Sequence, residues 1–535
     1  MTAFLKGAVK DDNNEKLIYF SRKLTAKEVY GEVDKIADFL IRKGVQKGES
    51  VMIVLPNIVQ GVTSVYGINA AGAVANVCHP KIGTDGLIKI AKKTNTKWVF
   101  LFDRFYAIHR EELKKNGLNV ILCRMSTHMN NLLFRLTEPC IRSQKGVYEY
   151  AKVVAPREEA LLSREKEGKG EDPAVYLHSS GTTGESKTVV LSNRAMNELA
   201  ANIHTTVNDA IGLSEKDSML MTLPLFHGFG LGVCVHLMMY FGKIVLEPVF
   251  NAKKTVKFLR KNEISFMCVV PNMLRRLIRE PGFDDKHLHH LRQIFVGGDK
   301  LDEKLLKESM EIMHKNGSPC RISEGFGLSE TASVTHINMD CKEGGTVGRP
   351  IANVKAKIMG KNGEMPVGEE GIIYICSPSL MSGYLGNGAT VITDEEGNKW
   401  LNTGDIGYVD EEGFLYYKGR QKRMLKVGGV NIFPQEVESV AESLPEVKNA
   451  CAVRVKWNGK PALKLLVVLH EGKELDVILK RRLENSIKSN ILPYAIPKYI
   501  EKVDELKMTG MGKTDYRFYE EEAAKQKDNK KNTRR

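Results

Sequence analysis

The most informative stretch of this chain is Leu177-His178-Ser179-Ser180-Gly181-Thr182-Thr183-Gly184-Glu185-Ser186-Lys187. Its small hydroxylated residues and glycines allow a tight turn whose backbone N–H groups and hydroxyls can converge on an anion, and the closing lysine offsets negative charge. The apolar runs at 174–177 and 188–191 predict one strand that enters this loop and a second strand that leaves it. A loop held between two strands and closed by lysine is less ordinary than a solvated Ser/Thr/Gly run, so the stretch predicts a phosphate-binding loop.

The spacing of this stretch is not that of a Walker loop. A Walker loop needs glycine, four residues and then Gly-Lys-Ser/Thr at the start of a helix, whereas we expect a strand after Lys187. The sequence Gly512-Lys513-Thr514 resembles the end of such a motif, but Lys507 stands where its first glycine would be. We therefore interpret neither segment as a Walker loop.

Length and composition favour a globular protein with more than one domain. A chain of 535 residues is too long for a single core, and its contents of 42 % hydrophobic and 27 % charged residues are ordinary. No secretory signal pattern opens the sequence, and the longest apolar run, 229–241, is too short to span a bilayer. The nine cysteines are scattered without a C-x-x-C pair, as in proteins of a reducing compartment. We therefore expect a cytoplasmic protein.

The formal net charge of +14 arises partly from a basic terminal run at 525–535 that contains no apolar residue. We interpret 518–535 as a charged, disordered tail. No nucleic-acid module accompanies the tail, so we expect no nucleic-acid partner, whereas the positive charge suits polyanionic ligands. The segment 129–142 mixes leucines with arginines in a way that would suit a membrane surface, but Pro139 interrupts it, so a covering loop or short core helix is favoured.

Alternating strand and helix patterns in the first part of the chain predict a largely parallel α/β sheet. Strand-like apolar runs occur at 50–55, 75–78, 98–101 and 120–122, with helical periodicity between the first two. Thr25 and Glu28 have the spacing of a capping box at the start of another helix.

The pattern changes in the second part of the chain. Short strands with Asn-Gly and Glu-Gly turns at 353–420 predict a small barrel-like subdomain, and 422–517 has the mixed pattern of a compact α+β domain. We therefore expect an α/β protein with a large N-terminal domain of mostly parallel sheets flanked by helices (1–420). A small, mobile α+β domain (421–517) follows it.

Five segments occur in the order found in one protein family. They are the loop 179–187, Gly325-Phe326-Gly327-Leu328-Ser329-Glu330-Thr331, Asn402-Thr403-Gly404-Asp405, the segment 419–426, and Thr509-Gly510-Met511-Gly512-Lys513. In this respect the chain resembles the adenylate-forming superfamily of acyl-CoA synthetases, peptide-synthetase adenylation domains and luciferases, and it looks closest to an acyl-CoA ligase. It departs from the family pattern at Ser186, where proline is usual, and at Thr188, where glycine is usual.

The resemblance implies a binding site for ATP and AMP. Phe326 would stack on adenine in place of the usual tyrosine, Asp405 would accept hydrogen bonds from the ribose hydroxyls, and Arg420 would complement it. Asp299 departs from the small residue often found in the pocket wall. The implied nucleotide-binding residues are Ser179, Ser180, Gly181, Thr182, Thr183, Gly184, Lys187, Gly298, Asp299, Gly325, Phe326, Gly327, Ser329, Asp405 and Arg420.

Activation of a carboxylate by ATP brings two anions together, so catalysis consists largely of charge compensation and positioning. By resemblance, Lys513 would bridge the acyl carboxylate and the α-phosphate, while Glu330 and Thr182 would hold Mg²⁺. His227, within an aromatic segment at 223–230, would gate the acyl channel, although a structural histidine is an equal reading.

The second half-reaction would follow a rotation of the small domain about a hinge at Lys422. Gly428 and Gly429 would then pair with the pantetheine arm of CoA. The resemblance thus implies an Mg²⁺- and ATP-dependent ligase that joins a fatty or other apolar acid to CoA. A free-standing adenylation enzyme that loads a carrier protein is the alternative, and a non-catalytic nucleotide-binding scaffold is a third reading.

We expect Lys513→Ala to reduce adenylate formation by about 100-fold or more, as does loss of other groups that stabilise transition-state charge. Hydroxamate trapping of the adenylate measures this step, and the nearby Lys507→Ala is a control for the loss of one positive charge. Full activity of Lys513→Ala would remove the catalytic assignment.

Overall fold

The protein is described by a computed structural model. The described residues are 1–129, 136–141, 144–156, 161–179, 187–283, 286–315, 317–386, 391–427, 430–457, 460–491, 493–508 and 514–523. They divide into two compact units. Unit 1 comprises 1–301, 305–355 and 375–401, and unit 2 comprises 302–304, 356–374 and the chain from 402 onward.

The first large sheet of unit 1 has nine strands, and their pairing is parallel from β14 through β13, β12, β10 and β11 to β1. In sheet order the strands are β16 (Arg349–Pro350), β15 (Val334–Ile337), β14 (Arg321–Gly327), β13 (Gln293–Val296), β12 (Phe266–Val269), β10 (Ser218–Met221), β11 (Lys243–Leu246), β1 (Glu15–Tyr19) and β2 (Arg22–Thr25).

The second sheet has eight strands and is parallel from β8 to β7, with an antiparallel pair at its other edge. In sheet order the strands are β19 (Gly383–Tyr384), β9 (Lys187–Ser192), β8 (Pro173–Ser179), β4 (Val74–Val77), β3 (Ser50–Val54), β5 (Trp98–Phe102), β6 (Asn119–Cys123) and β7 (Val147–Glu149). The strands predicted in the first part of the chain are confirmed, as is their parallel arrangement.

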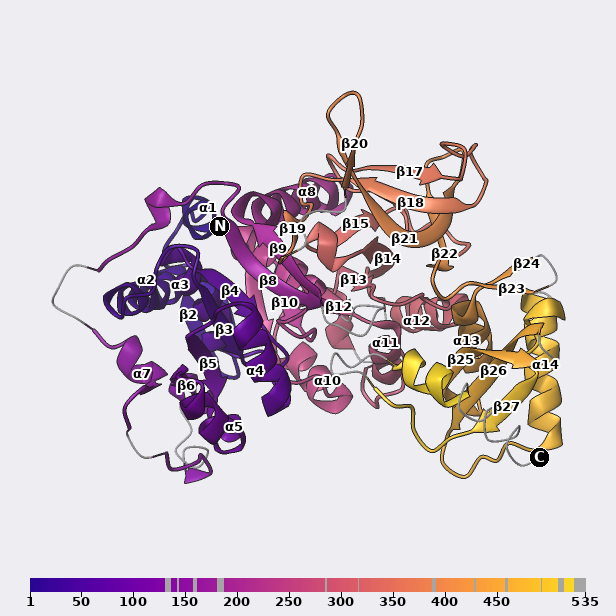
Figure 1. The fold of residues 1–535 in the computed structure, drawn as a ribbon, viewed down its shortest axis with the longest axis horizontal. Coiled ribbons are helices and arrows are strands. Elements are labelled where there is room, and N and C mark those ends of the chain that lie inside the picture. Colours follow the sequence, from indigo (N-terminus) through magenta and orange to yellow (C-terminus); the bar gives the residue numbers. More distant parts are fainter. Residues whose placement is uncertain are drawn as a thin grey trace. The chain divides into compact units, whose positions relative to one another are not determined.

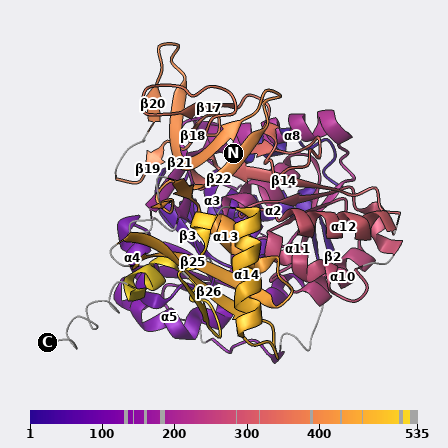
Figure 2. The same cartoon turned by 90° about the vertical axis from the view of Figure 1, so that its right-hand side faces the viewer.

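Helices flank the strands of both sheets (Figure 1 and Figure 2). They are α1 (Thr2–Gly7), α2 (Ala26–Arg42), α3 (Val59–Ala70), α4 (Thr84–Lys93), α5 (Asp103–Lys115), α7 (Tyr150–Val153), α8 (Asn193–Ile211), the π-helix η3 (Phe229–Leu237), α9 (Met238–Phe241), α10 (Ala252–Lys261), α11 (Pro271–Ile278) and α12 (Glu303–Lys315). The predicted capping box is confirmed: the Thr25 hydroxyl accepts from the Glu28 N–H, and the Glu28 carboxylate accepts from the Thr25 N–H. Among the described residues, no helix is both long and apolar enough to cross a membrane.

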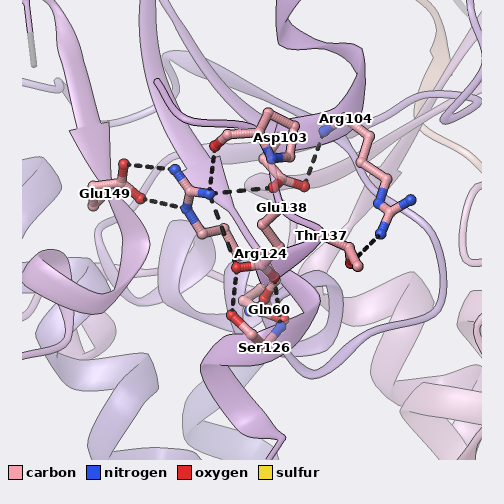
Figure 3. A network of polar contacts seen from close by, with 9 residues as sticks. Gln60, Asp103, Arg104, Arg124, Ser126, Thr137, Glu138 and Glu149 are labelled. Atoms are coloured by element: carbon pink, nitrogen blue, oxygen red, sulfur yellow. Dashed lines mark hydrogen bonds and ion pairs between the residues drawn. The ribbon is translucent and has the colours of Figure 1, made fainter. Parts of the chain in front are cut away.

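A polar network centred on Arg124 lies where β5, β6 and β7 end (Figure 3). The Arg124 guanidinium donates to both carboxylate oxygens of Glu149, at 3.1 and 3.2 Å, and to the backbone carbonyl of Pro139 at 2.9 Å. Glu138 accepts from the N–H and the hydroxyl of Ser126. The described part of segment 129–142 is therefore attached to the protein by polar contacts, while 130–135 and 142 lie outside the described residues.

The region predicted to be barrel-like contributes a five-stranded sheet. Its strands are β17 (Lys355–Met359), β18 (Gly371–Cys376), β20 (Val391–Thr393), β21 (Lys399–Val409) and β22 (Leu415–Arg420).

The remainder of unit 2 has the predicted α+β composition, with a core formed where both helices pack on a three-stranded sheet. Its elements are β23 (Leu425–Val427), β24 (Val430–Ile432), α13 (Pro434–Glu442), β25 (Val447–Trp457), β26 (Lys460–Leu469), α14 (Val477–Asn490) and β27 (Tyr499–Lys502). The fold class is therefore as predicted, whereas the domain boundary at Lys422 stays a prediction.

We expect Gly67→Ala to lower the thermal unfolding midpoint. The added methyl on α3 would lie 2.5 Å from Cγ2 of Ile36 in α2, so the two helices would have to move apart. Gly31→Ala is the matched control within α2, because its methyl would meet nothing within 4 Å. This control should gain about 0.5–1 kcal/mol of stability from the better helix former. Circular dichroism measures both midpoints, and an equal rise in the two variants would contradict the close approach of α2 and α3.

Candidate active site

The predicted strands on either side of the loop 179–187 are confirmed as the antiparallel pair β8 and β9. Their register pairs His178 with Thr188 and Ser179 with Lys187, so the strand pair holds the two ends of the loop side by side. Ser179 ends β8, and Lys187 opens β9 with an exposed side chain. Ser180, Gly181, Thr182, Thr183 and Gly184 lie outside the described residues.

A buried histidine supports the base of this loop. Nε2 of His178 donates to the side-chain carbonyl of Asn76 at 2.6 Å, and its Nδ1 accepts from the Thr188 hydroxyl at 3.3 Å. Asn76 in turn donates to the hydroxyls of Thr94 and Ser50. Burial lowers the pKa of His178 to about 4, so the imidazole is neutral at physiological pH and links three strands without adding charge.

Two of the predicted segments meet at the carboxyl edge of the nine-stranded sheet. Because β13 and β14 are parallel neighbours, the segment 297–299 after β13 lies beside Gly325 at the end of β14. A Cβ on Gly297 would lie 3.3 Å from the Gly325 carbonyl and 3.2 Å from the Phe229 ring, so the backbone packs closely against both at this glycine. Gly298 has a φ of +83°, and Asp299 is exposed. Such an edge is where open α/β sheets bind ligands.

Glu324 stabilises this edge from within the protein. Its side chain is 7 % exposed and accepts a hydrogen bond from the Leu301 N–H at 2.9 Å, which holds the segment that follows Asp299. Burial raises the pKa of Glu324 to about 8, so this carboxyl carries a proton at neutral pH.

The segment 328–333 is a tight turn that presents Glu330. The buried Thr331 hydroxyl accepts from the Leu328 N–H at 3.2 Å and donates to the Ser333 carbonyl at 2.8 Å. Ala332 has a φ of +62°, which costs a residue with a side chain about 1–3 kcal/mol. A Cβ on Gly327 would lie 2.0 Å from the Ser333 carbonyl, so the turn closes fully onto β14. Strain of this kind is typical of functional segments.

Glu330 and Lys187 both contact Tyr384. The phenol hydroxyl of Tyr384 donates to Oε1 of Glu330 at 2.7 Å, and Nζ of Lys187 lies 4.3 Å from the centroid of the Tyr384 ring. Glu330 is half-buried and keeps access to solvent. The structure thus brings together two predicted charged residues that are far apart in the sequence.

The aromatic segment around His227 packs against the turn that carries Glu330. A Cβ on Gly228 would lie 2.4 Å from the Ala332 carbonyl, so the two backbones are in direct contact. Asn57 positions the start of the segment: its side chain donates to the Leu223 carbonyl at 2.9 Å and accepts from the Leu225 N–H at 3.1 Å. The His227 ring is half-buried and lies 4.3 Å from that of Phe226. This placement suits either reading of His227, gate or structural residue.

The other rings and hydroxyls of this site have the following positions. The Phe326 ring is 9 % exposed and lies edge-on to the ring of His336 at 6.0 Å. Ser329 begins the short 3-10 helix η5 (Ser329–Thr331) and is half-buried. The adenine stacking predicted for Phe326 stays a prediction.

In unit 2, Asp405 and Arg420 face each other as predicted. They are register partners on β21 and β22, and Nε of Arg420 lies 2.9 Å from Oδ1 of Asp405. The Asp405 side chain is buried, whereas Arg420 remains partly exposed. Thr403 accepts from the Asp405 N–H at 3.0 Å and donates to the Ile373 carbonyl, which fixes the turn before the carboxylate.

Arg423 anchors the segment that follows the predicted hinge at Lys422. Its guanidinium donates to Glu438 at 2.7 Å and to the Ala452 carbonyl at 3.1 Å, and it stacks 3.5 Å from the Tyr516 ring centroid. Gly428, Gly429 and Lys513 lie outside the described residues. The ligand roles of all these residues remain predictions.

Comparison with known families decides the class of protein. The profile of the AMP-binding enzyme family matches residues 5–385, and that of the AMP-binding enzyme C-terminal domain matches residues 436–513. The chain belongs to the AMP-binding enzyme family. The predicted membership of the adenylate-forming superfamily is therefore confirmed, as is the prediction of an enzyme.

Relatives of this AMP-binding enzyme extend over most of its length. A Long-chain-fatty-acid–CoA ligase of Bacillus subtilis (strain 168) is 27 % identical over 530 residues, which cover 95 % of this chain and 91 % of that protein. An Indoleacetate–CoA ligase of Aromatoleum aromaticum is 31 % identical over 371 residues, which cover 66 % of this chain and 69 % of that protein.

The fold is shared with a CoA ligase of known structure. The crystal structure of an anthranilate CoA ligase in complex with anthranoyl-AMP superposes with a TM-score of 0.82 at 22 % identity, and the match covers 98 % of this chain and 96 % of that one.

Sequence reasoning assigned no role to four residues that hold the predicted segments in place: His178, Glu324 and Tyr384 in unit 1, and Arg423 in unit 2. His178 and Glu324 directly adjoin predicted motifs, and a buried polar residue next to a ligand segment is a signal that could have been read. The polar partners of Tyr384 and Arg423 are distant in sequence, so no local pattern reveals their contacts.

The raised pKa of Glu324 predicts a pH-dependent loss of stability. With an ordinary value near 4.5 in the unfolded chain and about 8 in the native protein, the stabilising contribution is complete below pH 4.5 and is lost as the pH rises through 8. Glutamine cannot ionise, so the unfolding midpoint of Glu324→Gln minus that of the wild type should increase from pH 5 to pH 8.5. Glu311→Gln, on the exposed face of α12, controls for the loss of a carboxyl. A difference that does not change with pH would contradict the burial of a neutral Glu324.

Proposed function

We propose that the protein is an ATP-dependent acid:CoA ligase that proceeds through an acyl-adenylate. The observation that supports this most directly is the convergence of Lys187 and Glu330 on Tyr384, beside the ends of the predicted phosphate loop. A cation for phosphate oxygens and a carboxylate for a metal ion are the two charges that a bound Mg·ATP requires. Both relatives named above are CoA ligases.

In the first half-reaction a carboxylate oxygen of the acid attacks the α-phosphorus of ATP. The bond from that phosphorus to the bridging oxygen breaks, and pyrophosphate leaves. Lys187 would offset the charge on the phosphates, and Lys513 would do so at the acyl carboxylate and α-phosphate. Asp405, held by Arg420 and Thr403, would bind the ribose hydroxyls.

Magnesium suits the donor chemistry of this site. Glu330 is half-buried, and a carboxylate oxygen is a donor that Mg²⁺ prefers. Thr182 is the predicted second ligand. When bound, the ion would neutralise part of the triphosphate charge, which lowers the cost of bringing a second anion to the α-phosphorus.

In the second half-reaction the CoA sulfur attacks the acyl carbon, and AMP leaves with its electron pair. Gly428 and Gly429 would line the path of the pantetheine arm, and the rotation that brings them there would occur at Lys422.

For the substrate we infer an acid with an apolar body and one carboxylate. The long-chain fatty acid and the indoleacetate named for the two relatives share this chemistry. Several apolar side chains after Phe229 are buried in this protein, including Leu231, Val233 and Val235. These residues pack against α8 as part of the core, so their apolar character does not indicate a chain length for the acid.

We expect pyrophosphate release from ATP to require an apolar acid together with CoA. A panel of fatty, aromatic and short polar acids, each with and without CoA, would be followed by a coupled pyrophosphate assay. Turnover with fatty acids alone would identify the aliphatic class, and turnover with aryl acids the aromatic class. Adenylate formation without CoA dependence would instead favour a carrier protein as acceptor. ATP binding without acid-dependent release across the panel would favour the scaffold reading and overturn the proposal.

A further inference from the structure

A lysine and a glutamate that bind the same ligand can pair with each other when that ligand is absent. Lys187 and Glu330 both approach the same residue, and a direct ion pair between them would occupy the cation and the carboxylate that phosphate and metal need. Among the described residues no ion pair joins the two, and each of them contacts Tyr384.

The position of Tyr384 is set by backbone pairing on both sides. Gly383 and Tyr384 form β19, which pairs with Val190 and Val189 of β9, and the Leu385 N–H donates to the Thr188 carbonyl at 2.9 Å. On the other side, the Met381 N–H donates to the Glu330 carbonyl at 2.8 Å. The segment 381–385 therefore connects the strand of Lys187 to the turn of Glu330.

The two contacts of the tyrosine side chain differ in kind. Its hydroxyl donates to Oε1 of Glu330 at 2.7 Å and so fixes the orientation of the carboxylate, as groups behind a metal ligand commonly do. Its ring face receives the Lys187 ammonium at 4.3 Å, a cation–π contact that holds the lysine without neutralising it. Donation from the hydroxyl to a carboxylate raises the electron density of the ring, so the first contact strengthens the second.

We propose that Tyr384 is a positioning residue that holds Lys187 and Glu330 apart and orients each of them for Mg·ATP. The proposal rests on the proposed function, because it assigns the two residues to phosphate and metal. It predicts that the Tyr384 hydroxyl affects metal binding through Glu330. It also predicts that the ring keeps both Lys187 and Glu330 available to the ligand.

Two substitutions separate these roles. Tyr384→Phe removes the hydroxyl and keeps the ring, so the affinity for metal-free ATP should stay near that of the wild type, while the enhancement of ATP binding by Mg²⁺ should fall about 10-fold. Tyr384→Leu also removes the ring and allows Lys187 to pair with Glu330, so the affinity for metal-free ATP should fall as well, by about 2- to 5-fold.

The measurement is calorimetric titration of ATP, without acid or CoA, in EDTA and then at a series of Mg²⁺ concentrations. Electron paramagnetic resonance of Mn²⁺ in the presence of ATP gives a second readout of the metal. Tyr416→Phe is the matched control, because it removes another phenol-to-carboxylate hydrogen bond, the 3.2 Å contact with Asp410. Its binding of ATP and metal should equal that of the wild type.

The outcomes distinguish this proposal from the proposed function. Loss of the Mg²⁺ enhancement in Tyr384→Phe, with metal-free ATP still bound as in the wild type, would support the positioning role and show that the variant is folded. Equal Mg²⁺ enhancement in Tyr384→Phe and the wild type would overturn it. A Tyr384→Leu variant with the phenotype of Tyr384→Phe would overturn the role of the ring. A wild-type protein that binds no ATP under any condition would count against the proposed function itself.

Discussion

The hydrogen-bonded pairing of β8 with β9 is the constraint on which the candidate site depends. It holds the two ends of the 179–187 loop together, and it carries β19 along its outer edge. Through β19 it also fixes the backbone of Tyr384, whose side chain contacts both Glu330 and Lys187. The strand pair is itself held by the buried side chain of His178 in β8, which is hydrogen-bonded to Asn76 in β4 and to Thr188 in β9.

In unit 1, the buried groups that support the candidate site are neutral, whereas the charged groups of that site contact solvent. The groups that support the site from inside, His178 and Glu324, are both neutral at physiological pH, because burial shifts the pKa of each toward its uncharged form. Lys187 and Glu330, the residues predicted to meet phosphate and metal, keep contact with solvent. His178 and Glu324 thus supply hydrogen bonds beneath the candidate site without placing a buried charge there.

Sequence alone predicts the elements of this protein well where the signal is local. The capping box at Thr25 and the strands on either side of the predicted phosphate loop follow from neighbouring residues, and all are observed. The order of motifs also identifies the superfamily. What sequence does not predict is the set of contacts between distant segments, such as Tyr384 with Glu330 or Asn57 with the segment before His227. These contacts depend on how the strands pair, and neither composition nor periodicity specifies the pairing of strands more than a hundred residues apart.

The anchoring of Arg423 has a mechanical consequence. Arg420 is tied to β21 through Asp405, while Arg423 is tied to α13 and β25 through Glu438 and the Ala452 carbonyl. Both ends of this short connection are therefore held in place, and between them the Gln421 N–H donates to the Gly404 carbonyl at 2.9 Å. The rotation predicted at Lys422 would have to occur between these two held positions. The same rotation would carry the residues after Arg423 as one body, because Arg423 is bonded to Glu438 and to the Ala452 carbonyl.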